Sequence, residues 1–213
     1  MRGLLARRAW LFDMDGTLVD TTALHAAAFR EALRHGHAHR LLRFDYADLA
    51  GRPTEDAFRS MGIEEAFIEE LTRRKREAYR ARLRDAGDVC FAGARELLRH
   101  LRERGKTVVV VTGAARASAA AVMEASGLSE LVRGVVAAED TTRGKPHPDP
   151  YEHALNHFGL DAADALVVED SDAGVESARV AGIEVVLVHR HRVDVPSFDS
   201  LGALDDALLR SGM

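Results

Sequence analysis

Two acidic residues separated by one position, Asp13 and Asp15, follow the apolar run Ala9–Phe12. The carboxyl end of a buried parallel strand is where ligands gather and where polar side chains can do chemistry. In a continuing strand both carboxylates point to the same face, and Gly16 lets the chain turn away directly after them. Two acids held this close suit a metal ion, or a pair in which one carboxyl is protonated. The alternative for this pair taken alone is a strand end whose acids only cap a turn.

A hydroxyl ends a second apolar run. Thr107–Val111 is β-branched, and Thr112 and Gly113 separate it from an alanine-rich helix that ends near Ser126. The free N–H groups at a helix N-terminus attract an anion, so Thr112 is a candidate ligand of a phosphate. The alternative is that Thr112 is only the N-cap of this helix.

A lysine is fixed in a proline-rich loop between a strand and a helix, in the segment Gly144–Tyr151. The two prolines that follow Lys145 stiffen the backbone and fix the direction of its ammonium group. Asp149 and Pro150 predict the start of a helix, with Asp149 as N-cap, and this helix ends at Gly159.

Adjacent acids, Glu169 and Asp170, end the run Ala165–Val168. Adjacent carboxylates without a basic neighbour repel each other, and a divalent cation relieves that repulsion. Mg²⁺ is the ion that we expect, because it is hard, prefers oxygen ligands and pairs with phosphate. For one of these acids the alternative is a helix cap, by Asp170 or by Asp172.

Composition limits the class of protein. The chain has 213 residues, of which 46% are hydrophobic and 30% charged, with a net charge of −5. The absence of a basic excess argues against nucleic acid as a partner. The single Cys90 excludes an internal disulfide, and no apolar run is long enough for a membrane span or, at the start of the chain, for a signal peptide. We therefore expect a cytoplasmic protein, without a membrane or nucleic-acid partner, and a monomer.

Helical patterns fill residues 21–88, whereas strands and helices alternate in the remainder. This order predicts an α/β fold: a Rossmann-like parallel-sheet core with helices on both faces, formed by residues 1–20 and 89–213, plus an inserted all-α cap domain of residues 21–88. The chain crosses between them near Thr17–Thr21 and Asp88–Gly93, which makes a natural hinge.

The predicted insertion contains several helices. They are Thr22–His35, a helix with Thr54 as N-cap, and Glu64–Arg84. The basic run Arg73–Arg76 is expected to be a solvated face, and the histidines at 35, 37 and 39 a solvated turn rather than a metal site. The other predicted elements of the core are a strand over residues 8–13, helices over 93–104, 171–181 and 201–209, and strands over 132–138 and 184–188.

The four segments that carry the candidate site residues resemble, in this order, the four motifs of the haloacid dehalogenase superfamily of phosphoryl-transfer enzymes. They contain Asp13 and Asp15, then Thr112, then Lys145, and then Glu169 and Asp170. The resemblance extends from Trp10 to Gly182, and the helical insertion after the first motif is similar to the subclass with an α-helical cap. That subclass includes phosphoglycolate phosphatases, sugar and polyol phosphatases, and β-phosphoglucomutases. The resemblance implies that Asp13 is the nucleophile that becomes an aspartyl phosphate, and that Asp15 is the general acid and then the general base.

The resemblance also implies a metal site and contacts to the substrate. Mg²⁺ is expected on Asp13, on the backbone carbonyl of Asp15 and on Asp170, with Glu169 beside it. Thr112 is expected to bind the phosphoryl oxygens, and Lys145 to neutralise Asp13 and the phosphate. The expected substrate-binding residues are Gly16, Thr21, His25, Gly51, Arg52, Thr54, Lys75, Gly113 and Ala114.

The predicted function is a Mg²⁺-dependent phosphatase of a small phosphorylated metabolite, such as a sugar or polyol phosphate. The presence of Asp15 argues against relatives that cleave carbon–halogen bonds or phosphonates, which lack an acid there. A β-phosphoglucomutase-like mutase is the main alternative: Thr21 and His25 match that group, but its cap arginine falls on Thr54 here. A non-catalytic phosphate-binding protein is a remote alternative, since no core motif residue is missing.

Overall fold

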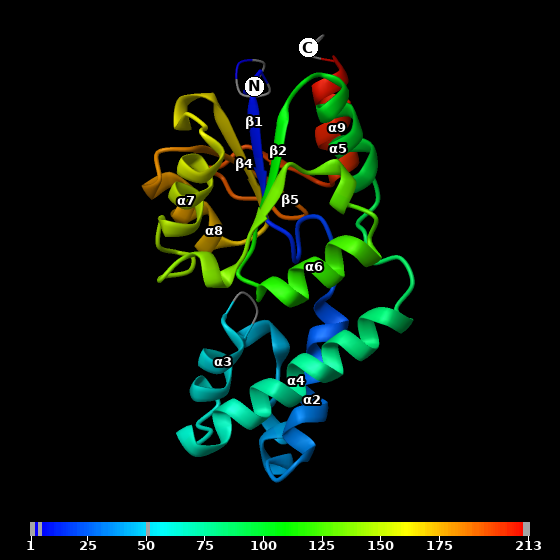
Figure 1. The fold of residues 1–213 in the computed structure, drawn as a ribbon, viewed down its shortest axis with the longest axis vertical. Helices are drawn as coiled ribbons and strands as arrows, with labels where there is room; N and C mark the ends of the chain where they lie inside the picture. The colour runs from blue at the N-terminus through cyan, green and yellow to red at the C-terminus, as the bar shows by residue number, and fades with distance from the viewer. Residues whose placement is uncertain (1–2, 4–5, 50–51, 211–213) are drawn as a thin grey trace. The chain divides into compact units, whose positions relative to one another are not determined.

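Six strands form a single parallel sheet in Met1–Asp20 and Val89–Met213, the compact part of the chain that we call the α/β unit. The computed structural model describes residues 3, 6–49 and 52–210 (Figure 1). The strand order is β3-β2-β1-β4-β5-β6, and all neighbouring strands are parallel. The strands are β1 (Ala9–Phe12), β2 (Thr107–Val111), β3 (Gly134–Val136), β4 (Ala165–Glu169), β5 (Glu184–Val188) and β6 (Ser197–Phe198).

Helices cover both faces of this sheet (Figure 1). On one face lie α7 (Asp149–Phe158) and α8 (Asp172–Val180), and on the other lie α5 (Ala94–Glu103) and α9 (Leu201–Arg210). The unit also contains α6 (Arg116–Ala125) and the 3₁₀ helices η3 (Ser129–Leu131), η4 (Ala138–Asp140) and η5 (Ala162–Asp164). The strand order and the helical layers are those of a Rossmann-like fold, so the predicted α/β fold class is confirmed.

The central strands are buried on both faces, which explains why they are continuously apolar rather than alternating. Leu11, Val109 and Val167 pack in one core cluster with Tyr151 of α7 and Val175 of α8. Side chains alternate along a strand, so the next residue after each of these faces the opposite helical layer. The side chain that follows β1 on the α7–α8 face is that of Asp13.

Residues Thr21–Asp88 form a second compact unit, which we call the helical unit. It consists of α2 (Thr22–Arg34), η1 (Ala38–Arg43), η2 (Tyr46–Asp48), α3 (Thr54–Ser60) and α4 (Glu65–Asp85). Phe29, Leu33, Phe58 and Leu71 are buried in its own core cluster. Among the described residues, no helix of either unit is long and apolar enough to cross a membrane.

Some local predictions are wrong. Thr54 is not an N-cap, because α3 begins at Thr54 and Pro53 precedes it. Asp149 is likewise the first residue of α7 rather than its N-cap, and its carboxylate binds Arg143 instead. The basic run is solvated at Arg73, whose side chain is 52% exposed, but Lys75 is only 6% exposed.

The other elements match their predicted positions to within a few residues. The 3₁₀ helices and the short strand β6 had not been predicted, since segments of two to six residues carry little periodic signal. The alternative that Asp170 or Asp172 caps α8 is wrong, because Ser171 is the N-cap and its hydroxyl accepts a hydrogen bond from the Gly174 N–H. Thr112 does not cap α6 either, whose N-cap is Ala115.

Candidate functional site

The strand register brings the predicted acids to one edge of the sheet. Phe12 of β1 is paired with Val110 of β2 on one side and with Val168 of β4 on the other. The next residue, Asp13, donates its N–H to the carbonyl of Val168 over 3.0 Å. Asp13 and Glu169 therefore leave adjacent strands at the same level and on the same face.

Lys145 lies between these two carboxylates. Its Nζ is 2.7 Å from Asp13 Oδ1 and 2.6 Å from Glu169 Oε1, and it also donates to the carbonyl of Val111 over 2.9 Å. These acceptors use all three protons of an ammonium group. Burial disfavours the charge, but the attraction of Asp13 and Glu169 outweighs it and holds the Lys145 pKa well above its usual value.

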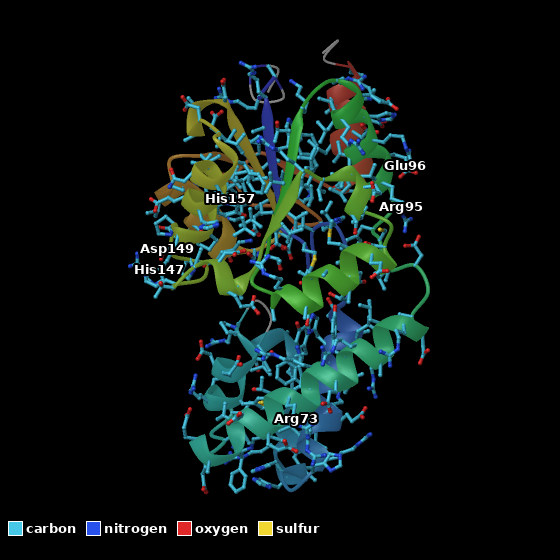
Figure 2. The ribbon with its side chains drawn as sticks, in the orientation of Figure 1. Arg73, Arg95, Glu96, His147, Asp149 and His157 are labelled. Carbon is cyan, nitrogen blue, oxygen red and sulfur yellow. The ribbon has the colours of Figure 1, made fainter. Side chains whose placement is uncertain are left out.

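The loop that carries Lys145 is anchored on both sides. Arg143 and Asp149 form a two-pronged ion pair across it, with N–O distances of 2.7 and 3.1 Å. The carbonyl of His147 accepts a hydrogen bond from Ser177 Oγ of α8 over 2.6 Å. His147 and Asp149 lie at the outer end of this loop, beside α7 (Figure 2). The prediction that the lysine sits in a fixed loop agrees with these contacts.

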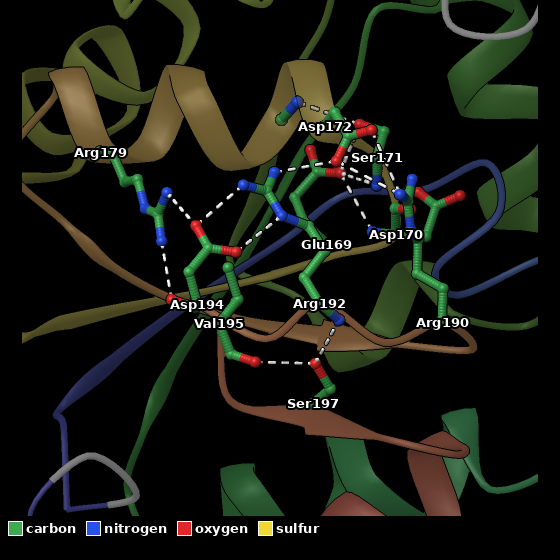
Figure 3. A network of polar contacts seen from close by, with 11 residues as sticks. Glu169, Asp170, Ser171, Asp172, Arg179, Arg190, Arg192, Asp194, Val195 and Ser197 are labelled. Atoms are coloured by element: carbon green, nitrogen blue, oxygen red, sulfur yellow. Dashed lines mark hydrogen bonds and ion pairs between the residues drawn. The ribbon is translucent and has the colours of Figure 1, made fainter.

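Glu169 is fully buried, and its carboxylate accepts several hydrogen bonds, of which Figure 3 draws those from Asp170 and Ser171. Oε1 accepts from Lys145 and from the hydroxyl of Tyr151, which is 2.9 Å away. Oε2 accepts from Ser171 Oγ at 2.9 Å and from the N–H groups of Asp170 and Ser171 at 3.1 and 3.2 Å. Burial alone would raise the Glu169 pKa, but Lys145 and the hydrogen bonds hold it below its usual value, so the group stays ionised.

Two glycines make room for the acids. A Cβ on Gly174 would lie 1.8 Å from the carboxyl carbon of Glu169, and a Cβ on Gly16 would lie 2.3 Å from Asp170 Oδ2. Gly16 also has φ +92°, a conformation that side-chain-bearing residues rarely adopt. The adjacent Thr17 donates its hydroxyl to Asp170 Oδ1 over 3.2 Å. The close approach of Glu169 to Gly174 and that of Asp170 to Gly16 therefore depend on the absence of a side chain at each glycine.

The donor set suits a hard divalent cation. Carboxylate oxygens of Asp13, Glu169 and Asp170 lie within 4.8 Å of one another. Burial and the neighbouring carboxylates raise the pKa of Asp13, against the opposing effect of Lys145. Burial and Glu169 raise the pKa of Asp170 to about 6. Three carboxylates against one ammonium leave negative charge in excess, which a cation would neutralise. The side chain of Asp15 is not part of this cluster.

The loop after β2 carries the predicted phosphate ligands. Thr112 is 4% exposed, and its hydroxyl oxygen accepts a hydrogen bond from the Ala114 N–H over 3.0 Å. That hydroxyl can still donate its own proton to an anion. Among the described residues, no atom outside the immediate chain neighbours lies within 4 Å of a Cβ built on Gly113, so the backbone is open toward them.

Three of the residues predicted to bind substrate meet inside the helical unit. Lys75 of α4 donates to His25 Nδ1 of α2 over 2.9 Å, and Thr54 Oγ1 of α3 is 3.5 Å from Lys75 Nζ. Because an ammonium group only donates, Nδ1 accepts and the His25 proton lies on Nε2. The ammonium also lies 4.9 Å from the ring centre of Phe29 and 5.4 Å from that of Tyr79. We call His25, Thr54 and Lys75 the polar cluster of the helical unit.

The other residues of the helical unit that were predicted to bind substrate are not part of the polar cluster. Thr21 is 1% exposed and its carbonyl accepts the His25 N–H, one turn below the polar cluster. Arg52 is exposed. Gly51 lies outside the described residues.

Several residues of the acidic site were missed. Tyr151 belongs to the segment quoted for Lys145, but its contact with Glu169 requires the turn of α7. Ser171 could have been found as an N-cap, from its spacing to Gly174. Thr17 gave no signal beyond its place after Gly16.

Comparison with known proteins identifies relatives over most of the chain. A model of the family described as "Haloacid dehalogenase-like hydrolase" matches residues 10–188. The chain is 32% identical over 183 residues to a protein named validoxylamine A 7'-phosphate phosphatase from Streptomyces hygroscopicus subsp. limoneus, covering 81% of each chain. It is 30% identical over 191 residues to protein CbbY from Rhodobacter capsulatus, covering 84% of each.

Solved structures share the fold. A crystal structure titled β-phosphoglucomutase from Clostridium difficile superposes with a TM-score of 0.83 at 18% identity, and the match covers 96% of each chain. At that identity the likeness concerns the fold alone.

Proposed function

We propose, since the chain belongs to the haloacid dehalogenase-like hydrolases, that it hydrolyses the phosphate ester of a small metabolite with Asp13 as nucleophile. This membership confirms the resemblance inferred from the four motifs and the enzyme class that it implied, a phosphoric monoester hydrolase. The observation that carries the proposal is the position of Lys145 Nζ, 2.7 Å from Asp13 Oδ1. An ammonium there reduces the repulsion between the carboxylate and an incoming phosphate dianion.

The proposed reaction has two steps, both at phosphorus. A carboxylate oxygen of Asp13 attacks phosphorus while the bond to the leaving oxygen breaks, which gives an aspartyl phosphate. Asp15 protonates the leaving alkoxide, and then takes a proton from the water that attacks the same phosphorus. Phosphate leaves and the Asp13 carboxylate is restored. Thr112 donates its hydroxyl to the phosphoryl oxygens during both steps.

Mg²⁺ fits the acidic site, and Asp13, Asp170 and the backbone carbonyl of Asp15 would hold it. When bound, Mg²⁺ supplies positive charge that neutralises the phosphoryl oxygens. We assign Glu169 a different task, because all of the hydrogen bonds that it receives already occupy both of its oxygens. Glu169 keeps Lys145 charged and in place rather than binding the metal.

The helical unit is proposed to select the substrate through its polar cluster. Lys75 is the group best suited to an anionic or polyhydroxylated substrate, since its ammonium is held by His25 and by two aromatic rings. One relative is named as a phosphatase of validoxylamine A 7'-phosphate. We therefore propose a sugar or polyol phosphate as the substrate class.

A phosphate-release screen tests the proposal. The full-length chain is assayed with sugar phosphates, polyol phosphates, phosphoglycolate and nucleotides, with and without Mg²⁺. We expect Mg²⁺-dependent release from at least one sugar or polyol phosphate, and a loss of at least about 10³-fold in kcat for Asp13→Asn. Normal turnover by that variant contradicts the proposed nucleophile.

The same assay separates a phosphatase from a mutase. Conversion of β-glucose 1-phosphate to glucose 6-phosphate, with a bisphosphate primer and little free phosphate, would establish the mutase instead. The position of Thr54, where mutases carry an arginine for the second phosphate, favours the phosphatase.

A further inference from the structure

The segment that follows β5 lies against the acidic site, although none of the four motifs includes it. His189 has φ 65°, the only positive φ of a non-glycine residue in the part of the chain that the structure describes. Histidine adopts this conformation more readily than most residues, but the conformation still persists only where the surroundings fix it. The contacts of His189 and Arg190 show what fixes it.

His189 contacts both segments through which the chain enters and leaves the helical unit. Its Nε2 lies 3.1 Å from the carbonyl oxygen of Thr17, so Nε2 carries the proton and donates. Its ring stacks on Phe91 with centroids 4.0 Å apart. These two segments are also joined directly, since the Phe91 N–H donates to the carbonyl of Leu18 over 3.0 Å.

Thr17 connects His189 to Asp170, because its carbonyl binds His189 and its hydroxyl binds Asp170. The Thr17 side chain is fully buried, and its hydroxyl donates to Asp170 Oδ1 over 3.2 Å. Because the Thr17 side chain is buried and its carbonyl is bound by His189, its hydroxyl has little freedom to move away from Asp170. His189 thereby restricts the orientation of the Asp170 carboxylate through one intermediate residue.

Arg190 holds the backbone of the same acid. Its guanidinium donates to the carbonyl of Asp170 over 3.2 Å and binds both oxygens of Asp172 at 3.2 and 3.3 Å. Asp172 also binds Arg192 over 2.8 Å, and Arg192 binds Asp194 (Figure 3). In this network, Arg190 contacts Asp170 and Arg192 does not.

We propose that His189 and Arg190 are positioning residues that hold Asp170 in the orientation required for Mg²⁺ binding. His189 acts on the side chain through Thr17, and Arg190 acts on the backbone carbonyl. Partners behind the ligands of a metal commonly change its affinity by 10- to 100-fold when removed. The inference rests on the proposed function, because it assumes that Asp170 binds the metal.

The charge of Arg190 allows an experiment to distinguish a positioning role from a purely electrostatic effect on Mg²⁺ binding. A guanidinium close to the site repels Mg²⁺, so its removal should strengthen binding if electrostatics were its whole effect. If Arg190 positions Asp170, its removal should instead weaken Mg²⁺ binding. Arg192 is the matched control, because Arg192→Met also removes a positive charge and an ion pair with Asp172 but leaves the contact with Asp170 intact.

Isothermal titration calorimetry of the full-length chain with Mg²⁺ measures these effects without turnover. We expect about tenfold weaker binding for Arg190→Met, near wild-type affinity for Arg192→Met, and partial recovery in Arg190→Lys, which keeps the charge without the planar fork. His189→Asn tolerates the backbone conformation but loses the imidazole donor, so it should also weaken binding. At saturating Mg²⁺, kcat of these variants should return to near the wild-type value.

The outcomes separate the two proposals. Wild-type protein that binds no Mg²⁺, or an Asp170→Asn variant that binds as well as wild type, overturns the metal site and this inference together. If Asp170→Asn loses binding while Arg190→Met and His189→Asn keep or increase it, only the positioning role fails. Circular dichroism verifies that each variant is folded, and because His189 and Arg190 act by separate contacts, misfolding of one leaves the other as a test.

Discussion

Lys145 Nζ lies 2.6 Å from Glu169 Oε1, and the Glu169 side chain has no exposed surface. Neither charge could stay buried without the other, since an unpaired ion in a protein interior costs several kcal/mol. The pair therefore links the stability of the α/β unit to the geometry of its acidic site. Glu169 thereby holds the ammonium of Lys145 beside Asp13.

Replacement of Glu169 by glutamine should be strongly destabilising. Every hydrogen bond of the Glu169 carboxylate is one that it accepts, from Lys145, Tyr151, Ser171 and two backbone N–H groups. A glutamine offers an NH₂ group to one set of these donors in either orientation, and it leaves Lys145 with one carboxylate fewer. We expect the free energy of unfolding to fall by about 3 kcal/mol, measured by urea titration.

The control for this variant is Glu65→Gln. Glu65 forms a close ion pair with Arg59, but its side chain is 71% exposed. Water and salt screen an exposed pair, so this variant should stay close to wild type in the same urea titration. Equal effects at the two positions would show that the buried pair has no special role.

Gly174 should not tolerate alanine, although it lies in a helix. Alanine normally stabilises a helical position by about 0.5–1 kcal/mol relative to glycine. At Gly174 the added Cβ would lie 1.8 Å from the Glu169 carboxyl carbon, and that carboxylate cannot move without losing Lys145. We expect Gly174→Ala to lower the unfolding free energy by at least about 2 kcal/mol and to reduce kcat.

Gly202 is the matched control for this substitution. It lies in the first turn of α9, and the nearest atom to a built Cβ is Ser200 Oγ at 3.7 Å. Gly202→Ala should be neutral or stabilising in the same urea titration. A stable, active Gly174→Ala protein would show that the acidic site can rearrange.

The main elements of the fold could be predicted from the sequence because the signals are local. The central strands are continuous apolar runs with the acids at their carboxyl ends, and Lys145 lies in a proline-rich loop between β3 and α7. Lys75 shows the limit of such signals. It lies in the charged run 73–76, but its spacing of four from both Leu71 and Tyr79 places it on the buried face of α4.

Contacts between distant segments could not be predicted in this way. His189 and Thr17 are 172 positions apart, and their hydrogen bond depends on the order of the strands and on one unusual backbone conformation. The contact of Tyr151 could not be predicted either, because an aromatic residue in an amphipathic helix usually indicates only that its ring is buried in the core. The structure adds the hydroxyl contact with Glu169, which no periodic pattern encodes.

Mg²⁺ affinity should fall below about pH 6. Burial and the adjacent Glu169 raise the pKa of Asp170 to about 6, so a proton competes with the metal below that pH. If one proton is displaced, the apparent affinity falls by up to about tenfold per pH unit. Calorimetric titrations between pH 5 and pH 7.5 measure this dependence, and a flat profile contradicts it.

The same group changes the stability of the metal-free protein. The folded-state pKa of Asp170 lies above its unfolded value, so the folded state takes up a proton first as the pH falls. The penalty for burying the charged carboxylate is present above about pH 6 and is relieved between about pH 6 and pH 4. This group should therefore favour folding more as the pH falls through that window. Thr17→Val removes a hydrogen bond to the ionised form, which should shift the window to higher pH.

Replacement of Lys75 by methionine should impair substrate binding more than stability. The ammonium is buried, and it lies against His25 and two aromatic rings. Methionine fills a similar volume without a charge to bury, so the melting temperature should stay the same or rise. If Lys75 binds the substrate, the loss of a charged hydrogen bond should raise KM by about tenfold or more, with a smaller effect on kcat.

Arg73→Met is the control, because Arg73 belongs to the same charged run but is exposed, and its ion pairs with Glu70 and Glu77 lie on the helix surface. Its KM should equal that of wild type, and its stability should stay close to that of wild type because water screens these pairs. If Lys75→Met keeps the wild-type KM while its stability falls, then Lys75 serves only the core of the helical unit. In that case the recognition of the substrate must be assigned to other side chains, of which Arg52 is the exposed candidate.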